Sequence, residues 1–405
     1  PDPNRPISVE EAQQRVLQEV VALAAVEVPV HEAHGRVLRE DVIAPEDVPA
    51  SDNSAMDGFA VRASDIIGAN SDRPAALTIL GEVAADSDPE VLVRGGAAAR
   101  IMTGGAIPEG ADAVIQVEET DAGENTVRIY RAGKAGLNIR RRGEDMRRGD
   151  VVLRSGIPLN AGELGVAVTA RRKTVMIGPQ PSVAILSTGD EIVSGRVANS
   201  NAITLAALTR EAGAVPHVFD AVPDDQVATR EALEKALKYD LIITSGGVSH
   251  GVFDFVKDAL DDLGAETKFW QVAMKPGKPV IFSRIGEKVA FGLPGNPVSC
   301  IVGFLLFVRP ALRKMMGQTS NLMLPALQAR AAERFESRGE RRMYFRVRLV
   351  SESGEIVAHA MRAQGSGIST SMVGANGLAW LDVETPHVDA RSPIPVLVFG
   401  PIASE

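Results

Sequence analysis

Apolar runs that alternate with helical patterns dominate the second half of this 405-residue chain. The runs are PSVAILSTG from Pro181, VPHVFDAVPDD from Val215, LIITSGG from Leu241 and KFWQVAMKPG from Lys268. Amphipathic patterns and one hairpin separate or follow them, at residues 202–211, 227–238, 253–263, 279–295 and 298–316. Consecutive strand–helix–strand units pack around a mainly parallel sheet with helices on both faces. The alternation therefore predicts a doubly wound α/β domain over residues 179–318.

Short β-branched segments dominate the chain on both sides of this domain. Ser8 and Glu11 have the spacing of a capping box, which predicts a helix over residues 9–25. Strand patterns such as LTILGEV, DAVIQVEE and TVRIYRAG follow, and the tail contains MYFRVRLV and PIPVLVF. We expect three further domains: a mixed α/β domain (1–45 with 138–178), an inserted β-rich domain (46–137) and a small C-terminal β-barrel-like domain (319–405).

The charge of the chain and the length of its apolar segments exclude several classes of protein. Asp and Glu number 52 against 43 Lys and Arg, and the net charge of -9 has the wrong sign for binding nucleic acid or an anionic membrane. The most apolar segment, CIVGFLLFV, is about half as long as a membrane span, and the start of the chain lacks a secretion-signal pattern. We therefore expect a cytoplasmic protein with no membrane or nucleic-acid partner.

Cysteine and histidine usage limits the kind of metal site. A single cysteine, Cys300, excludes an intrachain disulfide and a thiolate metal site, and its apolar neighbours favour a core position. The six histidines do not fall at metal-ligand spacing. We therefore expect any metal ion to be a hard cation bound by carboxylate and phosphate oxygens.

Unusual loops follow four of the predicted strands. Because ligands of open α/β sheets bind at the carboxyl ends of the strands, we expect these loops to form one site. A strand that ends in Gly246 and Gly247 lets a ligand approach the backbone closely and use its N–H groups, although Ser-Gly-Gly alone also fits an ordinary turn. The predicted substrate-contacting residues of the loops are Ser187, Thr188, Gly189, Ser245, Gly246, Gly247, Ser249, Pro294, Gly295, Asn296 and Pro297.

Charged residues accompany these loops. In MKPGKP, prolines and a glycine stiffen the chain between Lys275 and Lys278, and two ammonium groups on a rigid turn suit an anion of two or more charges. Glu191, Asp224 and Asp254 are expected at the same edge, where carboxylates repel a phosphate unless a cation intervenes. The presence of these acids beside the lysines predicts a Mg²⁺ ion that bridges carboxylate and phosphate oxygens. A plain turn or helix cap is an equal alternative for the pair Asp224 and Asp225.

Three stretches outside the α/β domain contain more small and polar residues than strand turns require. They are SDNSAMDGFAV from Ser51, RIMTGGAIPEGADAV from Arg100 and NIRRRGEDMRRGD from Asn138. The third is densely basic. A solvated face, a contact between subunits and a site for a phosphate or oxyanion all fit such a run.

Eight motifs together resemble the successive signatures of the molybdopterin molybdenumtransferase family, which is related to the E domain of gephyrin. They are NSAMDGFAV, RIMTGGAIPEGADAV, RRRGEDM, VAILSTGDEI, TSGGVSHGVFDFV, VAMKPGKPV, GLPGNPVSC and QGSGISTSMVGANGL. Their order along the chain makes the resemblance specific. It implies an elongated homodimer of four-domain subunits with the active site at the subunit interface.

The resemblance also implies a reaction. Enzymes of this family take adenylylated molybdopterin and molybdate, cleave the pyrophosphate link in a Mg²⁺-dependent reaction, insert the metal at the dithiolene and release AMP. Matching the motifs residue by residue gives catalytic roles to Asp57, Thr103, Asp145, Glu191, Asp224, Asp254, Lys275 and Lys278.

The implied roles divide these residues into three groups. Glu191, Asp224 and Asp254 are expected to organise Mg²⁺ and the pyrophosphate. The two lysines are expected to attract phosphate or molybdate, and Ser299 to donate a hydrogen bond to the oxyanion. The remaining three, Asp57, Thr103 and Asp145, are expected to complete the cleft from another domain, of the same subunit or of its partner.

Two other functions fit parts of the sequence. The α/β domain alone resembles molybdopterin adenylyltransferases, which act one step earlier, but those enzymes need no long N-terminal region with NSAMDGFAV. A non-catalytic, gephyrin-like scaffold is the second alternative, and the presence of every expected acid argues against it. The expected protein partners are the adenylyltransferase and apo-molybdoenzymes. Tungstate resembles molybdate in size and charge, so the sequence is compatible with either oxyanion.

Overall fold

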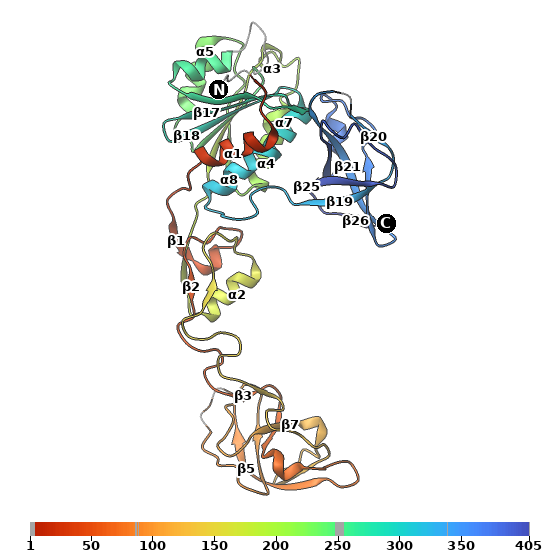
Figure 1. The fold of residues 1–405 in the computed structure, drawn as a ribbon. Coiled ribbons are helices and arrows are strands. Elements are labelled where there is room, and N and C mark those ends of the chain that lie inside the picture. Colours follow the sequence, from red (N-terminus) through yellow and green to blue (C-terminus); the bar gives the residue numbers. More distant parts are fainter. Residues whose placement is uncertain (1–4, 86, 88, 248–254, 338, 405) are drawn as a thin grey trace. The chain divides into compact units, whose positions relative to one another are not determined.

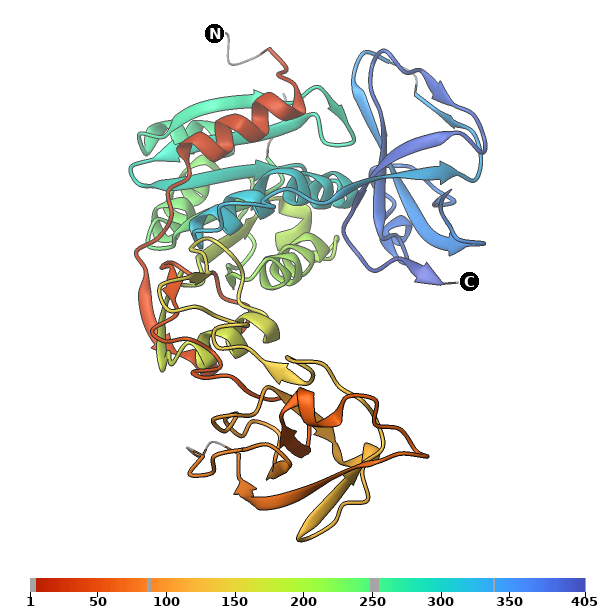
Figure 2. The same cartoon turned by 60° about the horizontal axis from the view of Figure 1, so that its bottom comes forward.

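The computed structural model describes residues 5–85, 87, 89–247, 255–337 and 339–404 (Figures 1 and 2). Internal contacts divide the chain into two compact units. The first unit comprises residues 1–40, 155–161 and 174–405, and the second comprises residues 41–154 and 162–173. The predicted boundaries of the four domains remain predictions.

A six-stranded sheet forms the centre of the first unit (Figure 1). Its order is β13-β12-β14-β18-β17-β15, and β13, β12, β14 and β18 are parallel. β17 runs antiparallel to both of its neighbours and forms the predicted hairpin with β18. The mainly parallel sheet is thus confirmed, with β15 at the edge beyond the hairpin. The strands are β12 (Ser182–Ser187), β13 (Val215–Val218), β14 (Leu241–Ser245), β15 (Glu266–Gln271), β17 (Pro279–Ile285) and β18 (Lys288–Leu293).

Helices cover both faces of this sheet, which confirms the doubly wound arrangement. α5 and α6 pack on one face, and Ala184 of β12 points into their core. The opposite face is covered by α1, α4, α7 and α8, and the preceding residue, Val183, points there. Because both faces are covered, the central strands β12, β14 and β18 are buried at nearly every position instead of alternating, whereas the edge strand β13 is largely exposed. The three crossover helices are α4 (Ser200–Glu211), α5 (Gln226–Ala236) and α6 (Phe255–Asp262).

The N-terminal helix α1 (Val9–Glu19) is shorter than predicted. Its start is correct, because the Glu11 N–H donates to the Ser8 Oγ at 3.1 Å, as the capping box predicts. The helix ends well before residue 25, because the chain then becomes extended and the Leu23 N–H donates to the Met315 carbonyl. A tertiary hydrogen bond therefore replaces the last predicted turns.

The long helix predicted over residues 298–316 has an irregular middle. It consists of α7 (Pro297–Gly303), a π-helical segment η4 (Phe304–Val308) and α8 (Arg309–Met315). Pro310 has no N–H to donate, and its ring crowds the preceding turn, so a wider turn before it relieves the clash. Cys300 lies in α7 and is buried, which confirms its predicted core position.

Five strands of the C-terminal region close into a barrel, which confirms the predicted barrel-like domain. β21 pairs with β22 and β23, β25 pairs with β23 and β19, and β19 pairs with β22. Val347, Leu349 and Val396 are among the apolar side chains that fill it. The barrel strands are β19 (Ala326–Ala331), β21 (Arg342–Glu352), β22 (Glu355–Ala360), β23 (Gly377–Leu381) and β25 (Pro393–Val398).

Short elements complete the first unit. β16 and β26 each add to β21 in parallel, β1 pairs with β11, and β20 pairs with β24. Their bounds are β1 (Val26–Pro29), β11 (Thr174–Ile177), β16 (Met274–Lys275), β20 (Phe335–Glu336), β24 (His387–Val388), β26 (Ala403–Ser404), α3 (Asp190–Val193), η1 (Val30–Glu32) and η5 (Ser369–Met372).

The second unit is mainly β structure. A five-stranded sheet has the order β7-β4-β6-β5-β8, and two short antiparallel pairs, β2–β10 and β3–β9, accompany it. The strand patterns LTILGEV, DAVIQVEE and TVRIYRAG are confirmed as β5, β7 and β8. Helix α2 was not predicted, because Gly162 and Gly165 lower its helix propensity. The elements are β2 (Val42–Ile43), β3 (Asn53–Ser54), β4 (Gly58–Val61), β5 (Ala75–Val83), β6 (Ala97–Ile101), β7 (Ala113–Gln116), β8 (Thr126–Ile129), β9 (Ile139–Arg140), β10 (Val151–Leu153), α2 (Ala161–Thr169), η2 (Ala63–Ile66) and η3 (Val117–Glu119).

Candidate functional site

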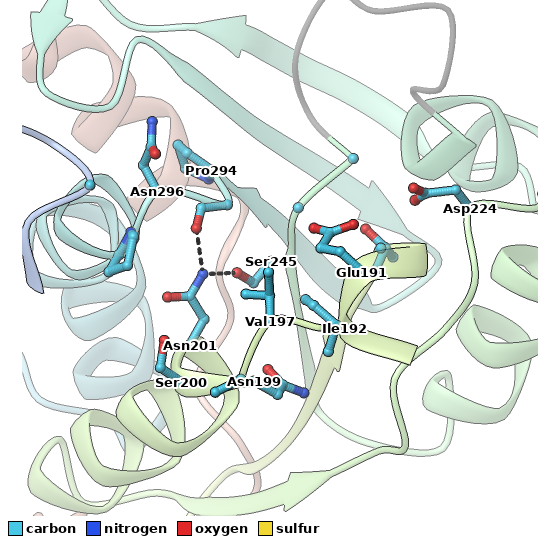
Figure 3. Close-up of a pocket in the computed structure, with 18 of the residues that line it drawn as sticks. Glu191, Ile192, Val197, Asn199, Ser200, Asn201, Asp224, Ser245, Pro294 and Asn296 are labelled. Carbon is cyan, nitrogen blue, oxygen red and sulfur yellow. Dashed lines mark hydrogen bonds between the residues drawn. The ribbon is translucent and has the colours of Figure 1, made fainter. Parts of the chain in front are cut away.

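A pocket of about 750 Å³ lies at the carboxyl edge of the six-stranded sheet (Figure 3). All four predicted loops contribute to its wall, because the parallel strands before them end at the same edge. Figure 3 shows Glu191 and Asp224 along one side and Pro294 and Asn296 on the other. Of the predicted residues, the lining includes Thr188, Gly189, Glu191, Asp224, Ser245, Gly246, Gly247, Pro294, Gly295, Asn296 and Pro297.

The two glycines after β14 are required by the backbone and by their neighbours. Gly246 and Gly247 have φ values of 97° and 63°, in the region that side-chain-bearing residues rarely adopt. A Cβ on Gly246 would stand 2.7 Å from the Thr188 carbonyl oxygen. The Gly246 N–H donates to the Leu293 carbonyl at 3.1 Å, so this amide is not free for a ligand. The glycine contributes close approach rather than the open amide expected from the sequence.

Thr188 leaves a polar atom without a partner at the pocket. Its side chain is 7% exposed, and its Oγ1 has no hydrogen-bond partner among the described residues. A buried hydroxyl without a partner is unfavourable in a folded protein. Because Thr188 lines the pocket, a polar group of a bound ligand is the natural partner for this oxygen.

Asn201 links two of the loops, and sequence reasoning did not assign it to the site. Its Nδ2 donates to the Ser245 Oγ and to the Gly295 carbonyl, both at 2.8 Å (Figure 3). Nearby, at the end of β12, the Ser187 Oγ donates to the Asn199 Oδ1 at 2.9 Å. Asn199 is also the N-cap of α4. The Asn-Ser-Asn sequence signals a helix start, but the signal does not reveal which loops the side chains reach.

The loop after β18 meets a segment of the barrel. The Val298 N–H at the start of α7 donates to the Ser366 carbonyl at 3.1 Å. The next residue, Gly367, lines the pocket, although only its motif was singled out in the sequence. Ser299 is 3% exposed and is not part of the lining, so its predicted hydrogen bond to an oxyanion stays a prediction.

Acidic groups concentrate at one end of the pocket. The Asp224 N–H donates to the Asp190 carboxylate at 3.1 Å, and the Asp190 N–H donates to the Asp224 carboxylate at 3.4 Å. Burial raises the pKa of Asp224, and the negative charges of Asp190 and Glu191 raise it further. The adjacent Asp225 caps α5 by accepting from the Ala228 N–H at 2.8 Å. The helix-cap alternative therefore describes Asp225, whereas Asp224 faces the pocket.

The proposed metal ligands are only partly visible. Asp254 and the predicted contact residue Ser249 lie outside the described residues. Within the described part of the chain, no three acidic, histidine or cysteine side chains are grouped as a metal site. Glu191 and Asp224 supply two carboxylates to one pocket, and a divalent cation between them would offset the repulsion that, after burial, helps to raise the pKa of Asp224. These donors therefore fit a hard cation such as Mg²⁺.

The two predicted lysines line a different pocket of the first unit, with a volume of about 660 Å³. Lys275 and Lys278 share it with Arg5 and Arg341, and among the described residues Glu340 is the only acidic one in its lining. None of the four cations forms an ion pair with another described residue. An unneutralised positive pocket of this kind suits a small multiply charged anion.

The turn that carries these lysines is built tightly against α7. Gly277 has a φ of 95°, and a Cβ placed there would lie 3.5 Å from the Ser299 carbonyl oxygen. Lys275 pairs with Met343 of the barrel strand β21. The turn is therefore fixed on two sides, as the proline and glycine content predicts, and Pro279 at its end lines the first pocket.

The other three predicted residues belong to the second unit. Asp57 and Thr103 contact each other, because the Thr103 N–H and Oγ1 donate to the Asp57 Oδ1 at 2.6 and 2.8 Å. Both bonds lower the pKa of Asp57, and the bond from the Thr103 backbone N–H has the larger effect. Asp145 is exposed, and its N–H donates to the Val48 carbonyl at 3.0 Å.

Ion pairs account for part of the basic run after Asn138. Arg141 pairs with Asp52 and Arg142 pairs with Asp47, each at 2.5 Å. Backbone N–H groups of the same run donate to both aspartates. The contacts favour a structural role for these two arginines.

Three family comparisons cover most of the chain. Residues 7–170 match the MoeA N-terminal region (domain I and II), residues 184–314 a probable molybdopterin binding domain, and residues 328–399 the MoeA C-terminal region (domain IV). Molybdopterin molybdenumtransferase 2 of Mycobacterium tuberculosis is 36% identical over 402 residues, which are 96% of this chain and 98% of that protein.

The chain belongs to the MoeA family. The molybdopterin molybdenumtransferase of Staphylococcus epidermidis is 36% identical over 320 residues, 77% of this chain and 76% of that protein. A crystal structure of the molybdopterin biosynthesis moeA protein from Pyrococcus horikoshii matches with a TM-score of 0.82 and 28% identity, and it covers 98% of this chain and 100% of that one. Family membership makes the chain a transferase of molybdenum cofactor biosynthesis.

In the described part of the chain no helix has the length and apolarity to cross a membrane.

Proposed function

We propose that this MoeA-family protein is a molybdenum insertase that cleaves adenylylated molybdopterin, inserts molybdate into the dithiolene and releases AMP. The observation that carries the proposal is the 750 Å³ pocket, whose wall combines close-packed glycines, an unpartnered Thr188 hydroxyl and two carboxylates. A nucleotide-linked pterin presents a pyrophosphate and several polar ring atoms, and this wall offers partners for both.

The chain's own residues have distinct tasks in this proposal. Gly246 and Gly247 admit the phosphate to the backbone, and the Thr188 Oγ1 bonds a ligand atom that displaces water. Asn201 holds the loops after β14 and β18 at a fixed separation. Glu191 and Asp224 would hold Mg²⁺, with Asp254 as the third predicted ligand. The ion, when bound, neutralises phosphate charge and so favours departure of AMP.

We place molybdate in the basic pocket. Lys275, Lys278, Arg5 and Arg341 carry four positive charges around one cavity, which attracts a dianion of this size. The turn between the two lysines adjoins both pockets, because Lys278 lines one and Pro279 lines the other. The oxyanion is thus held beside the pterin site before it reacts. Tungstate carries the same charge and is expected to compete.

The test is AMP release by the purified full chain from adenylylated molybdopterin, with Mg²⁺ and molybdate added. We expect Glu191→Gln and Asp224→Asn to lower the rate roughly tenfold or more, the scale on which disturbed metal sites lose activity. Asp225→Asn is the matched control, because asparagine also caps a helix and the residue is adjacent. Unchanged rates in both pocket variants would contradict the assignment.

The basic pocket and the second unit have separate readouts in the same assay. Lys278→Met is expected to raise the molybdate concentration needed for half-maximal rate, without changing AMP affinity. Asp57→Asn tests whether the residues of the second unit take part in the reaction. Production of adenylylated molybdopterin from ATP would favour the adenylyltransferase alternative, and no turnover with either substrate would favour the scaffold. We also expect a homodimer in sedimentation experiments.

A further inference from the structure

A buried arginine of the barrel has no counter-ion among the residues that the structure describes. Arg346 lies in β21 and is 1% exposed. It is the largest fully buried side chain among the described residues. No carboxylate pairs with it in the described part of the chain. Burying a guanidinium is costly unless several hydrogen bonds replace its water. Its hydrogen-bond partners therefore indicate what the residue does.

All the partners of Arg346 belong to one segment, residues 361–371, which we call the barrel loop. The NH2 group donates to the carbonyls of Ala363 and Gly365 at 3.1 and 3.2 Å, and the Nε donates to the Ser371 Oγ at 3.3 Å. Gln364 adds a second layer, because its amide accepts from the Arg346 N–H at 3.0 Å and donates to the Arg346 carbonyl at 2.9 Å. Arg346 thus binds the loop through both its side chain and its backbone.

The opposite side of the barrel loop faces the ligand pocket. The Ser366 carbonyl accepts from the Val298 N–H at the start of α7, and Gly367 lines the pocket. A Cβ added to Gly367 would lie 3.7 Å from the Asn296 Oδ1, so the barrel loop passes close to the loop after β18. The residues to which Arg346 donates hydrogen bonds are therefore adjacent in sequence to Gly367, which lines the pocket.

We propose that Arg346 is a positioning residue that fixes the barrel loop, so that Gly367 forms one wall of the pocket. A buried guanidinium serves this task because its planar group bonds two carbonyls through one terminal nitrogen and Ser371 through the Nε, which no apolar side chain can do. The effect on catalysis rests on the function proposed above. The ordering of the loop does not, because it depends only on contacts within the first unit.

Hydrogen exchange on the full chain tests the ordering directly. Arg346→Met keeps the length of the apolar part and removes all three side-chain bonds. We expect amides of residues 361–371 to exchange about tenfold faster or more, since hydrogen bonds to a charged group are each worth about that factor. Amides of β19, which Arg346 does not contact, should be unchanged. Arg348→Met is the matched control, because that arginine lies on the same strand but is exposed.

Turnover separates positioning from general destabilisation. Arg346→Met leaves the carbonyls of Ala363 and Gly365 without this donor, so we expect a lower thermal transition, and turnover is measured well below that transition, where the variant is folded. KM for adenylylated molybdopterin should rise roughly tenfold with kcat much less affected, because the loop shapes the pocket and does not reach reacting atoms. Arg346→Lys keeps the charge without the fork, and it should give a smaller increase in both exchange and KM.

The outcomes distinguish this inference from the function it rests on. Unchanged exchange of the barrel loop in both Arg346 variants overturns the inference, whatever the activity. Faster exchange with an unaltered KM also overturns it, since the loop would then not shape the pocket. A wild-type protein that releases no AMP refutes the proposed function, and the exchange measurement still decides whether Arg346 orders the loop.

Discussion

The clearest stability prediction concerns Asn201, which joins the ends of two neighbouring strands. Its Nδ2 donates to the Ser245 Oγ, which is partly buried, and to the Gly295 carbonyl, which is exposed. Asn201→Ala removes both hydrogen bonds and changes little else, because alanine is well tolerated in a helix. The loop after β18 should therefore lose its link to α4.

The size of the effect follows from the surroundings of each bond. An intramolecular hydrogen bond contributes about 1 kcal/mol net, and one whose partner can turn to water contributes closer to ~0.5 kcal/mol. The sum is about 1.5 kcal/mol of unfolding free energy. For a unit of this size the midpoint of thermal unfolding should fall by about 3 °C.

Tryptophan fluorescence provides a selective assay. The chain has two tryptophans, Trp270 and Trp380, and both belong to the first unit, so their emission follows that unit alone. Ser200→Ala is the matched control, because this exposed residue precedes Asn201 in the same helix turn. A double-mutant cycle with Ser245→Ala isolates the buried bond. If Asn201→Ala unfolds at the same temperature as the control, the reasoning about this link is wrong.

Three further predictions use other features of the first unit. Gly246→Ala should destabilise the first unit by at least about 1 kcal/mol more than Gly264→Ala. Both glycines have positive φ, but only Gly246→Ala places a Cβ 2.7 Å from a carbonyl oxygen. The same fluorescence transition measures the difference. Glu191→Gln should lower the raised pKa of Asp224, as a carbon-13 NMR titration can measure. A carboxyl whose pKa is raised in the folded state stabilises that state at low pH. Stability should therefore vary less with pH in the variant. Burial raises the pKa of Cys300 to about 12, so iodoacetamide at pH 8 should modify it only after unfolding, as mass spectrometry can show.

Much of the fold could be predicted because the signals are local. The apolar runs from Pro181 onward became strands, and Ser8 became a helix cap. One error came where a distant contact competes with local preference, and another where a proline alters a helix locally. α1 ends early because Leu23 bonds to Met315, and α7 continues into α8 through a π turn because of Pro310.

The candidate site was predictable in part for the same reason. Parallel strands bring their carboxyl ends together, so loops such as the one after Ser245 could be expected to converge. Lys275 and Lys278 were expected beside the acids, but they line the separate basic pocket. Asn201 and Gly367 were missed, because their contribution depends on which loops meet.

By itself, the sequence determined the parallel sheet, the edge at which its loops meet and the family to which the chain belongs, because periodicity and motif order are properties of neighbouring residues. Only the tertiary structure decided which loop touches which, how Arg346 is buried against residues 361–371, and that the acids and lysines occupy different pockets. The physical reason is that side-chain hydrogen bonds and burial are set by packing between segments tens of residues or more apart, for which local preference carries no information.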